Sequence, residues 1–309
     1  MNNTIPHWSQ TSARLLNACP RSWVLTYAHE ANASFQQQRG RRLASRRPRT
    51  FDEAQVQCMR TTWLERIQDQ FLGKTWSPLY LERRLQNHLE DAMTTLEPPV
   101  PSIHITMAVH RSLRQLQHLE DTLSLRPLFG SKPHRWAYFD RREGATLPSL
   151  HLYAAPDVAV HHQHRWTLVR LQFRSPSTTL LSQELEHRLM VHWAMNQPGF
   201  PKDWRAYRVK VVRWNINRWI EHTVSVSEET LGQAMALIHH DVQEMKWLQR
   251  TAMADPSLSS VPLASSQNSC LGCQHRPACP ARDGLAAAKT NAVNVKLNQS
   301  EETKSARTA

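Results

Sequence analysis

Long apolar stretches are missing from this chain of 309 residues. No run of roughly eighteen or more apolar residues occurs, so the sequence offers no membrane-spanning helix. The first residues, MNNTIPHWSQ, are polar and lack the basic and then apolar order of a secretory signal. The apolar share of 40% and the charged share of 21% are near globular averages. We therefore expect a folded, soluble, cytoplasmic protein that binds no membrane.

Cysteine is also scarce, with five residues in the whole chain. In a reducing compartment an odd number argues against a disulfide framework and favours metal or cluster ligation. Three of the five are close together near the C-terminus, in the pattern Cys270-x2-Cys273-x5-Cys279. Thiolates are soft ligands, and the Cys-x2-Cys spacing lets two sulfurs reach one metal centre. A fourth ligand is needed, and the candidates are Cys19, Cys58 and His275.

These candidates for the fourth ligand differ in their sequence context. Cys58 lies on an apolar stripe of a predicted helix, where a lone cysteine is usually a small buried hydrophobe. Cys19 lies at a predicted helix break and is followed by Pro20, just as Cys279 is followed by Pro280. The sequence therefore favours Cys19 over Cys58.

Acidic side chains are too few to balance the basic ones. The chain has 26 Asp and Glu against 38 Lys and Arg, a formal net charge of +12. This excess favours a polyanionic partner, with nucleic acid as the leading candidate, although an acidic protein or a plain need for solubility gives the same composition. Six of the basic residues form an arginine-rich loop that is either a solvated linker or an arm that contacts phosphates: Arg39, Arg41, Arg42, Arg46, Arg47 and Arg49.

Periodicity predicts both helices and strands along the chain. A proline break at Pro20 separates two short N-terminal helices, and Ser227 caps a long helix near the C-terminus. Further helical spacing covers residues 51–97, 103–123 and 180–195. A period near two predicts strands, joined by turns at 161–164 and 215–218, over residues 150–161, 166–174, 205–214 and 219–226.

The cysteines give the chain a family resemblance. Cys19-Pro-Arg-x-Trp near the start, paired with Cys270-x2-Cys273-x5-Cys279 near the end, resembles the iron-sulfur branch of the PD-(D/E)XK (RecB-like) nucleases. That branch includes the CRISPR adaptation exonuclease and the AddB subunit of bacterial helicase-nucleases. The resemblance implies that these four cysteines hold a [4Fe-4S] cluster. The alternative is a zinc ion held by the same four cysteines, or with His275 as a substitute ligand.

A cluster or a zinc ion would play the same structural part. Either one would close a loop of about 250 residues and supply folding free energy that the apo chain lacks. The expected role of the cluster is therefore that of a clasp between the two ends of the chain and not that of a redox catalyst.

The resemblance also implies a fold. We expect an α/β, restriction-endonuclease-like core with a mixed central sheet flanked by helices, a helical insertion, and the iron-sulfur clasp. The core order is a helix, three strands, a helix and a further strand, with catalytic residues on the second and third strands. The expected regions are 1–50 with the first cluster ligand and the arginine-rich loop, 51–135 with the first core helix, 136–250 with the core, 251–283 with the cysteines, and 284–309 as a disordered tail.

The catalytic motifs of the family are only partly present. Asp157 matches the acid of the first motif, which ligates Mg²⁺, although an ordinary acid at a strand edge looks the same in sequence. In the second motif Gln172 replaces the acid and Arg174 replaces the lysine. Glutamine offers only a neutral carbonyl to a metal, and arginine is never deprotonated in practice. Arg188 and His192 replace the glutamine and tyrosine of the helix that follows.

These replacements predict that catalysis has been lost. We expect Arg170, Arg174 and Arg188 to converge where a metal would lie, and to bind phosphate there. The expected function is that of an inactive nuclease-like protein that binds DNA, or RNA, beside other protein subunits in a prokaryotic nucleic-acid-processing or defence complex.

Two other functions remain open at this point. An active Mg²⁺-dependent exonuclease or endonuclease would need Asp157 and a second acid such as Asp140 or Glu186, and Mg²⁺ is expected only in that case. A purely structural scaffold would contact only protein, through its tryptophan-rich helices.

Overall fold

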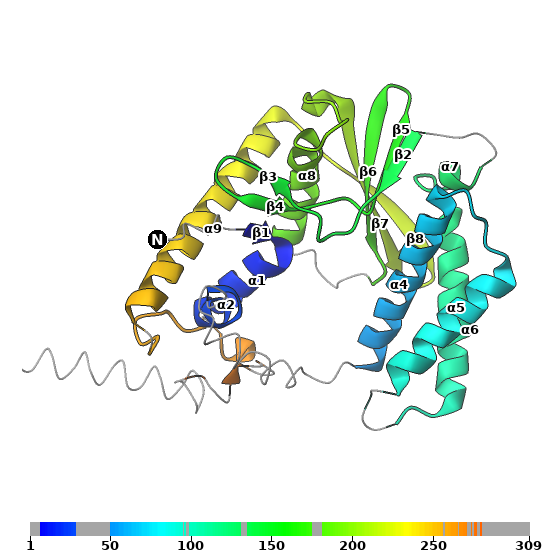
Figure 1. Cartoon of the computed structure of the whole chain (residues 1–309), viewed down its shortest axis with the longest axis horizontal. Coiled ribbons are helices and arrows are strands. Elements are labelled where there is room, and N and C mark those ends of the chain that lie inside the picture. Colours follow the sequence, from blue (N-terminus) through cyan, green and yellow to red (C-terminus); the bar gives the residue numbers. More distant parts are fainter. Residues whose placement is uncertain are drawn as a thin grey trace, which may run out of the picture. The chain divides into compact units, whose positions relative to one another are not determined.

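A computed structural model describes residues 7–28, 50–94, 96, 99–130, 135–174, 181–255, 257–264, 266–270, 273, 275–276 and 279 (Figure 1). The chain forms two compact units, each discontinuous in sequence. Unit 1 comprises Met1–Gln10 and Pro48–Ile238, and unit 2 comprises Thr11–Arg47 and His239–Ala309. The tail predicted for 284–309 lies outside the described residues, as does the arginine-rich loop with Arg39, Arg41, Arg42, Arg46, Arg47 and Arg49.

The centre of unit 1 is a mixed sheet of five strands in the order β2-β5-β6-β7-β8. Neighbouring strands are antiparallel except for β6 and β7, which are parallel. Parallel neighbours need a crossover connection, and α8 (Leu181–Met195) lies between them in the chain. The strands are β2 (Arg135–Tyr138), β5 (Val158–His162), β6 (Arg165–Gln172), β7 (Tyr207–Asn215) and β8 (Arg218–Val224).

One face of this sheet packs against helices. A single apolar core joins Trp63, Ile67 and Leu85 of the helices to Val169 and Leu171 of β6. Side chains alternate along a strand, so Arg170 and Gln172 project from the other face, toward α8. The helices on the apolar face are α4 (Phe51–Phe71), α5 (Pro78–Met93), α6 (Ser102–Glu120) and the short α7 (Arg126–Phe129).

A smaller sheet in unit 1 has the order β1-β4-β3. The strand β1 runs parallel to β4, and β3 runs antiparallel to it. Trp8 at the centre of β1 is completely buried. The strands are β1 (His7–Ser9), β3 (Ala145–Thr146) and β4 (His151–Tyr153).

The α/β class and the mixed sheet flanked by helices are confirmed, but the structure differs from the sequence prediction in three details. The strand predicted over 150–161 is divided between β4 in the small sheet and β5 in the large one, with Pro156, which has no N–H to donate, in the link. The helical spacing predicted over 51–97 corresponds to two helices, because Gly73 turns the chain with φ +77°. The short strands β1, β2 and β3 were not predicted, since so few residues show no clear period.

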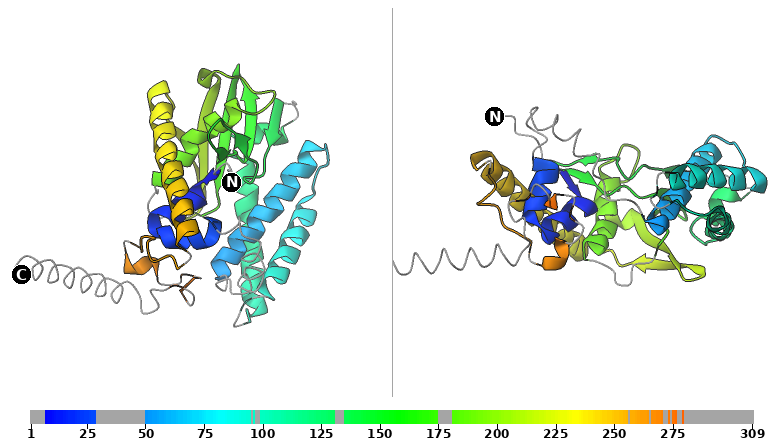
Figure 2. Two further views of the ribbon diagram at one scale, coloured as in Figure 1. Left: turned by 60° about the vertical axis from the view of Figure 1, so that its left-hand side comes forward. Right: turned by 90° about the horizontal axis from the view of Figure 1, so that it is seen from below.

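Unit 2 contains most of α1 (Gln10–Ala18), all of α2 (Pro20–Tyr27) and the C-terminal part of α9 (Glu228–Ala254). The helices α1 and α2 lie beside the end of α9 in each view (Figure 2). The predicted break occurs at Cys19, which is the N-cap of α2 and is followed by Pro20 in the first turn. The short helix η4 (Gln267–Ser269) precedes the cysteine segment. None of the helices in the described residues is long and apolar enough to span a membrane.

Buried hydrogen bonds join the two sequence segments of unit 2. The guanidinium of Arg21 is buried and donates from Nη2 to the carbonyl oxygens of Leu258 and Val261, the latter at 2.9 Å. Trp23 donates from Nε1 to Ser12 Oγ at 2.9 Å and joins α2 to α1. The N-terminal helices and the segment after α9 are therefore held together by bonds from a side chain to the backbone.

Candidate functional site

Asp157 is buried at the point where the chain enters β5. Its backbone N–H donates to the carbonyl of Val169 at 2.9 Å, and Val158 pairs with Val169 in the sheet register. The next register position therefore places Asp157 opposite Arg170 on β6. The backbone N–H of Leu171 donates to Asp157 Oδ2 at 2.7 Å. The backbone of β6 thus fixes one oxygen of this carboxylate.

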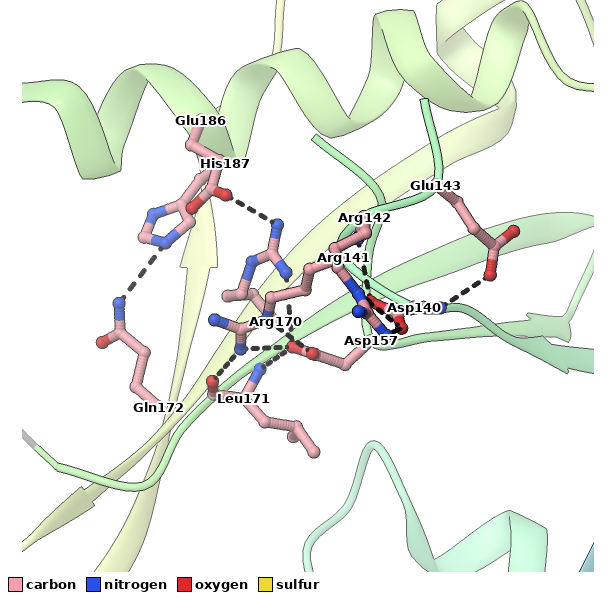
Figure 3. A network of polar contacts seen from close by, with 10 residues as sticks. All are labelled: Asp140, Arg141, Arg142, Glu143, Asp157, Arg170, Leu171, Gln172, Glu186 and His187. Carbon is pink, nitrogen blue, oxygen red and sulfur yellow. Dashed lines mark hydrogen bonds and ion pairs between the residues drawn. The ribbon is translucent and has the colours of Figure 1, made fainter. Parts of the chain in front are cut away.

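Arg141, in the turn that follows β2, binds the same carboxylate with two N–H groups of its guanidinium (Figure 3). Its Nε donates to Oδ1 of Asp157 at 2.7 Å, and its Nη2 donates to Oδ2 at 2.8 Å. The Nη2 group also donates to the carbonyl of Leu171. A bidentate contact of this kind is the strongest that a carboxylate makes with a side chain. The sequence pattern alone did not identify Arg141.

Arg170 lies between two carboxylates. Its Nη1 is 3.5 Å from Asp157 Oδ2, and its Nη2 is 3.1 Å from Glu186 Oε1 on α8. Its side chain is 1% exposed. Asp157, Glu186, Arg141 and Arg170 form a cluster of two negative and two positive charges, which we call the arginine–carboxylate cluster (Figure 3).

The arginines keep Asp157 ionised. Burial by itself raises the pKa of this carboxyl, but the charges of Arg141 and Arg170 and the hydrogen bonds from Arg141 and Leu171 outweigh it and lower the pKa to about 2. The carboxylate is therefore negative at neutral pH, and its charge is neutralised within the protein.

The cluster occupies the position at which the family resemblance implies a divalent cation. A hard cation such as Mg²⁺ requires anionic oxygens with free lone pairs. Both oxygens of Asp157 already accept hydrogen bonds from Arg141, and Oδ2 accepts a further one from Leu171. The positive charge that would balance this carboxylate is supplied by guanidinium groups.

The two acids considered as second metal ligands are also paired. Asp140 is 40% exposed and lies 2.6 Å from Arg142 Nη2 in a surface ion pair. Glu186 contacts Arg170. Both of these acids thus have an arginine partner, which disfavours an active metal-dependent site.

Gln172 and His187 adjoin the cluster on the α8 face of the sheet. The side-chain nitrogen Nε2 of Gln172 is 3.5 Å from Nε2 of His187, a long contact (Figure 3). Burial, together with the positive charges of Arg170 and Arg141, lowers the pKa of His187 to about 3, so the ring is neutral at physiological pH. Gln172 therefore lies beside a neutral ring at the edge of the cluster.

The predicted convergence of three arginines is corrected by the structure. Arg170 is enclosed between Asp157 and Glu186 and does not present its guanidinium to a ligand. Arg174 is exposed just beyond β6, and Arg188 is half-buried on α8. His192 is half-buried on the same helix, and burial lowers its pKa.

The second candidate site, in unit 2, is formed by the cysteines. One cavity is lined by all four of the predicted ligands, Cys19, Cys270, Cys273 and Cys279, together with His275 and residues of α2. Burial raises the pKa of the Cys19 thiol, and the other three cysteines raise it further. Those three cysteines, about 250 residues away in sequence, are thus near Cys19 in space.

Ser22 in the first turn of α2 contacts two of the cysteines. Its backbone N–H donates to Cys19 Sγ at 3.4 Å, and its Oγ is 4.0 Å from Cys273 Sγ. His275 forms a hydrogen bond with Thr26, with 2.9 Å between its Nε2 and Thr26 Oγ1. Cys58 is elsewhere, in unit 1, where its buried thiol donates to the carbonyl of His88 at 3.1 Å.

The donor set of this cavity fits an iron-sulfur cluster. Four cysteine thiolates are the usual ligands of a [4Fe-4S] cluster, and four thiols line the cavity. Across the described part of the chain, no group of three or more His, Cys, Asp or Glu side chains is arranged so that it could hold a metal ion. The fit therefore rests on the chemistry of the donors and on their common cavity.

Comparisons with known proteins add little. No family model and no curated protein matches the chain. The crystal structure of SSO0001 is similar at 11% identity, with 71% of this chain and 94% of that chain covered and a TM-score of 0.28. A likeness at that score carries no argument about fold or activity.

Proposed function

We propose that this protein is an iron-sulfur, catalytically inactive PD-(D/E)XK nuclease-like protein that binds nucleic acid, DNA in the first place, as a subunit of a prokaryotic nucleic-acid-processing or defence complex. The observation that carries the loss of catalysis is the arginine–carboxylate cluster. It contains Asp157, the acid that matches the first motif of the family, in a bidentate contact with Arg141.

The order of elements in unit 1 supports the proposed fold family. A helical region is followed by three strands of the large sheet, β2, β5 and β6, then by α8 and by β7, with β3 and β4 of the small sheet inserted between β2 and β5. Asp157 directly precedes the second of these strands, and Gln172 ends the third. The resemblance implies the same order, with catalytic residues on the second and third strands.

The chemistry of the cluster supports the absence of hydrolysis. Metal-assisted cleavage of a phosphodiester needs a cation that activates water and stabilises the developing charge. Binding Mg²⁺ at Asp157 would break the hydrogen bonds from Arg141 and Leu171 and leave Arg141 without its partner. It would also place a divalent cation next to Arg170, whose side chain is 1% exposed.

The cavity in unit 2 supports the cluster. Cys19, Cys270, Cys273 and Cys279 would hold a [4Fe-4S] group, with zinc as the alternative. The group, when bound, would covalently tie the start of α2 to the segment after α9. Its contribution is therefore to stability within unit 2.

The net charge of +12 supports a polyanionic partner. The decisive experiment uses the full chain, purified without oxygen, with labelled single-stranded and duplex DNA and with RNA of the same sequence. We expect binding that weakens steeply with salt, and no cleavage in Mg²⁺ or Mn²⁺. Cleavage that disappears in Asp157→Ala would refute inactivity. A failure to bind any of these nucleic acids at low salt would instead favour the protein scaffold.

A further inference from the structure

The α8 face of the sheet carries arginine side chains beyond the arginine–carboxylate cluster. Arg213 on β7 is the register partner of Gln172 on β6. Partners on adjacent parallel strands project to the same face and are about 4.8 Å apart. Arg213 and Gln172 are thus neighbours on the face that α8 covers.

The side chain of Arg213 has no hydrogen-bond or ion-pair partner within the described residues. Its Nε is buried and makes no hydrogen bond there, although the side chain as a whole is half-buried and reaches solvent. A buried guanidinium nitrogen without an acceptor is unfavourable, and native proteins pair almost all such groups. An anion from outside the chain would provide the missing acceptor.

The charges around Arg213 are unbalanced in favour of an anion. The two carboxylates of the cluster, Asp157 and Glu186, are already paired with Arg141 and Arg170. On the next strand the exposed His222 is the register partner of Val211, which places it on the same face as Arg213. The exposed Arg174 follows Gln172 by two residues.

Positively charged side chains also lie near His187. This ring contacts the side chain of Gln172 and is buried. After burial itself, the groups that lower its pKa are the arginines Arg170, Arg141 and Arg188 and the ring of His222. The space beside Gln172 is therefore electropositive.

We propose that Arg213, Gln172 and Arg174 form a binding site for one phosphodiester group of a nucleic-acid strand. The guanidinium of Arg213 supplies two parallel N–H donors, the amide of Gln172 supplies another, and Arg174 adds charge at the exposed side. The glutamine that replaces the catalytic acid thereby acts as a donor to the phosphate, where an acid would repel it. This inference rests on the proposed function, since it names the contact that holds the nucleic acid.

A matched pair of variants tests the site. Arg213→Gln removes the proposed contact, and Arg208→Gln removes one charge from the opposite face of the same strand, where Arg208 is exposed and has no partner in the described part of the chain. Affinity for labelled single-stranded DNA and for RNA of the same sequence is measured over a range of salt concentrations. The comparison of the two shows whether the bound phosphate belongs to DNA or to RNA.

We expect Arg213→Gln to weaken binding about tenfold and to reduce the slope of log affinity against log salt by about one, with Arg208→Gln close to wild type. Arg213→Lys keeps the charge and should restore the slope but only part of the affinity. Equal affinity in Arg213→Gln and Arg208→Gln, with both folded, would overturn the site while leaving the proposed function in place.

A second arm, isothermal titration of wild type and Arg213→Gln with inorganic pyrophosphate, separates the two proposals. Pyrophosphate binding that depends on Arg213, without binding of either nucleic acid, would leave an anion site and refute the proposed function. Wild-type protein that binds neither nucleic acid nor pyrophosphate would overturn both.

Discussion

The guanidinium of Arg141 and the carboxylate of Asp157 meet in two parallel hydrogen bonds of 2.7 and 2.8 Å, 16 residues apart in sequence. The side chain of Asp157 is 5% exposed and that of Arg141 is 28% exposed. A cation within the protein thus neutralises this buried acid. The same pair of side chains carries both the proposed absence of catalysis and a large part of the expected electrostatic stability of unit 1.

Removing Arg141 should destabilise unit 1. Arg141→Gln leaves the buried carboxylate of Asp157 without its main partner, and we expect a loss of about 2 to 4 kcal/mol in the free energy of unfolding. The adjacent Arg142 is 89% exposed in its pair with Asp140, so Arg142→Gln should change stability by less than about 0.5 kcal/mol. Urea unfolding followed by tryptophan fluorescence compares them, and similar losses in both variants would contradict a special role for Arg141.

Acid should weaken the fold through Asp157. Its pKa is about 2 in the folded protein, against 3.8 for the ordinary side chain, so the unfolded chain takes up the proton first. The stabilisation, about 2 kcal/mol, is complete above pH 4 and is lost as the pH falls from about 4 to about 2. Unfolding free energies from pH 5 to pH 2 should show this decline in wild type. In Asp157→Asn the same curve should be flatter, and an unchanged curve would contradict the prediction.

His187 should make the stability of the fold depend on pH at higher pH values than Asp157 does. Its folded pKa is lowered from 6.5 to about 3, so below pH 6.5 the unfolded chain binds a proton that the buried ring does not. Stability should therefore fall as the pH drops from about 6.5 toward 3. His187→Gln should remove this dependence, whereas the exposed His118→Gln on α6 should retain it. Thermal unfolding at pH 7.5, 6 and 5 provides the comparison, and parallel pH curves for His187→Gln and wild type would disprove it.

The cysteines should divide into two classes. Cys273→Ser removes a thiol from the shared cavity and should abolish the visible absorbance of anaerobically purified protein, with loss of about four iron atoms per chain. Cys58→Ser keeps a donor toward the carbonyl of His88 and should leave absorbance and iron content unchanged. If the protein is colourless and contains about one zinc per chain, and this zinc is lost in Cys273→Ser, the cavity binds zinc and not an iron-sulfur cluster.

The sequence predicted the sheet better than it predicted the site. The period of two along β6 follows from one apolar and one polar face, and the burial of Val169 and Leu171 with the helices is what that pattern implies. The turn between β5 and β6 also occurs as expected, with Gln163 and His164 at positive φ. Those features depend on residues that are close together in sequence.

The arginine–carboxylate cluster depends on residues that are far apart in sequence. Arg141 reaches Asp157 only because β2 and β5 pair and the turn after β2 returns toward β6. In sequence, Arg141 and Arg142 beside Asp140 look like a surface ion pair, and Arg142 does form one. The burial of Arg170, an arginine in an alternating strand, was also not predictable, since its partner Glu186 lies on α8.

The two-segment composition of unit 2 has a consequence for synthesis on the ribosome. Met1–Gln10 and Pro48–Ile238 can fold while the rest of the chain is still being made, but Thr11–Arg47 belongs with His239–Ala309. Arg21 is 237 and 240 residues away from the carbonyls it binds. At about 5 to 20 residues per second, α1 and α2 wait roughly 10 to 50 s for the residues that cover them. The last thiol of the cavity, Cys279, is made later still, so α1 and α2 are synthesised long before all four thiols can hold a group together.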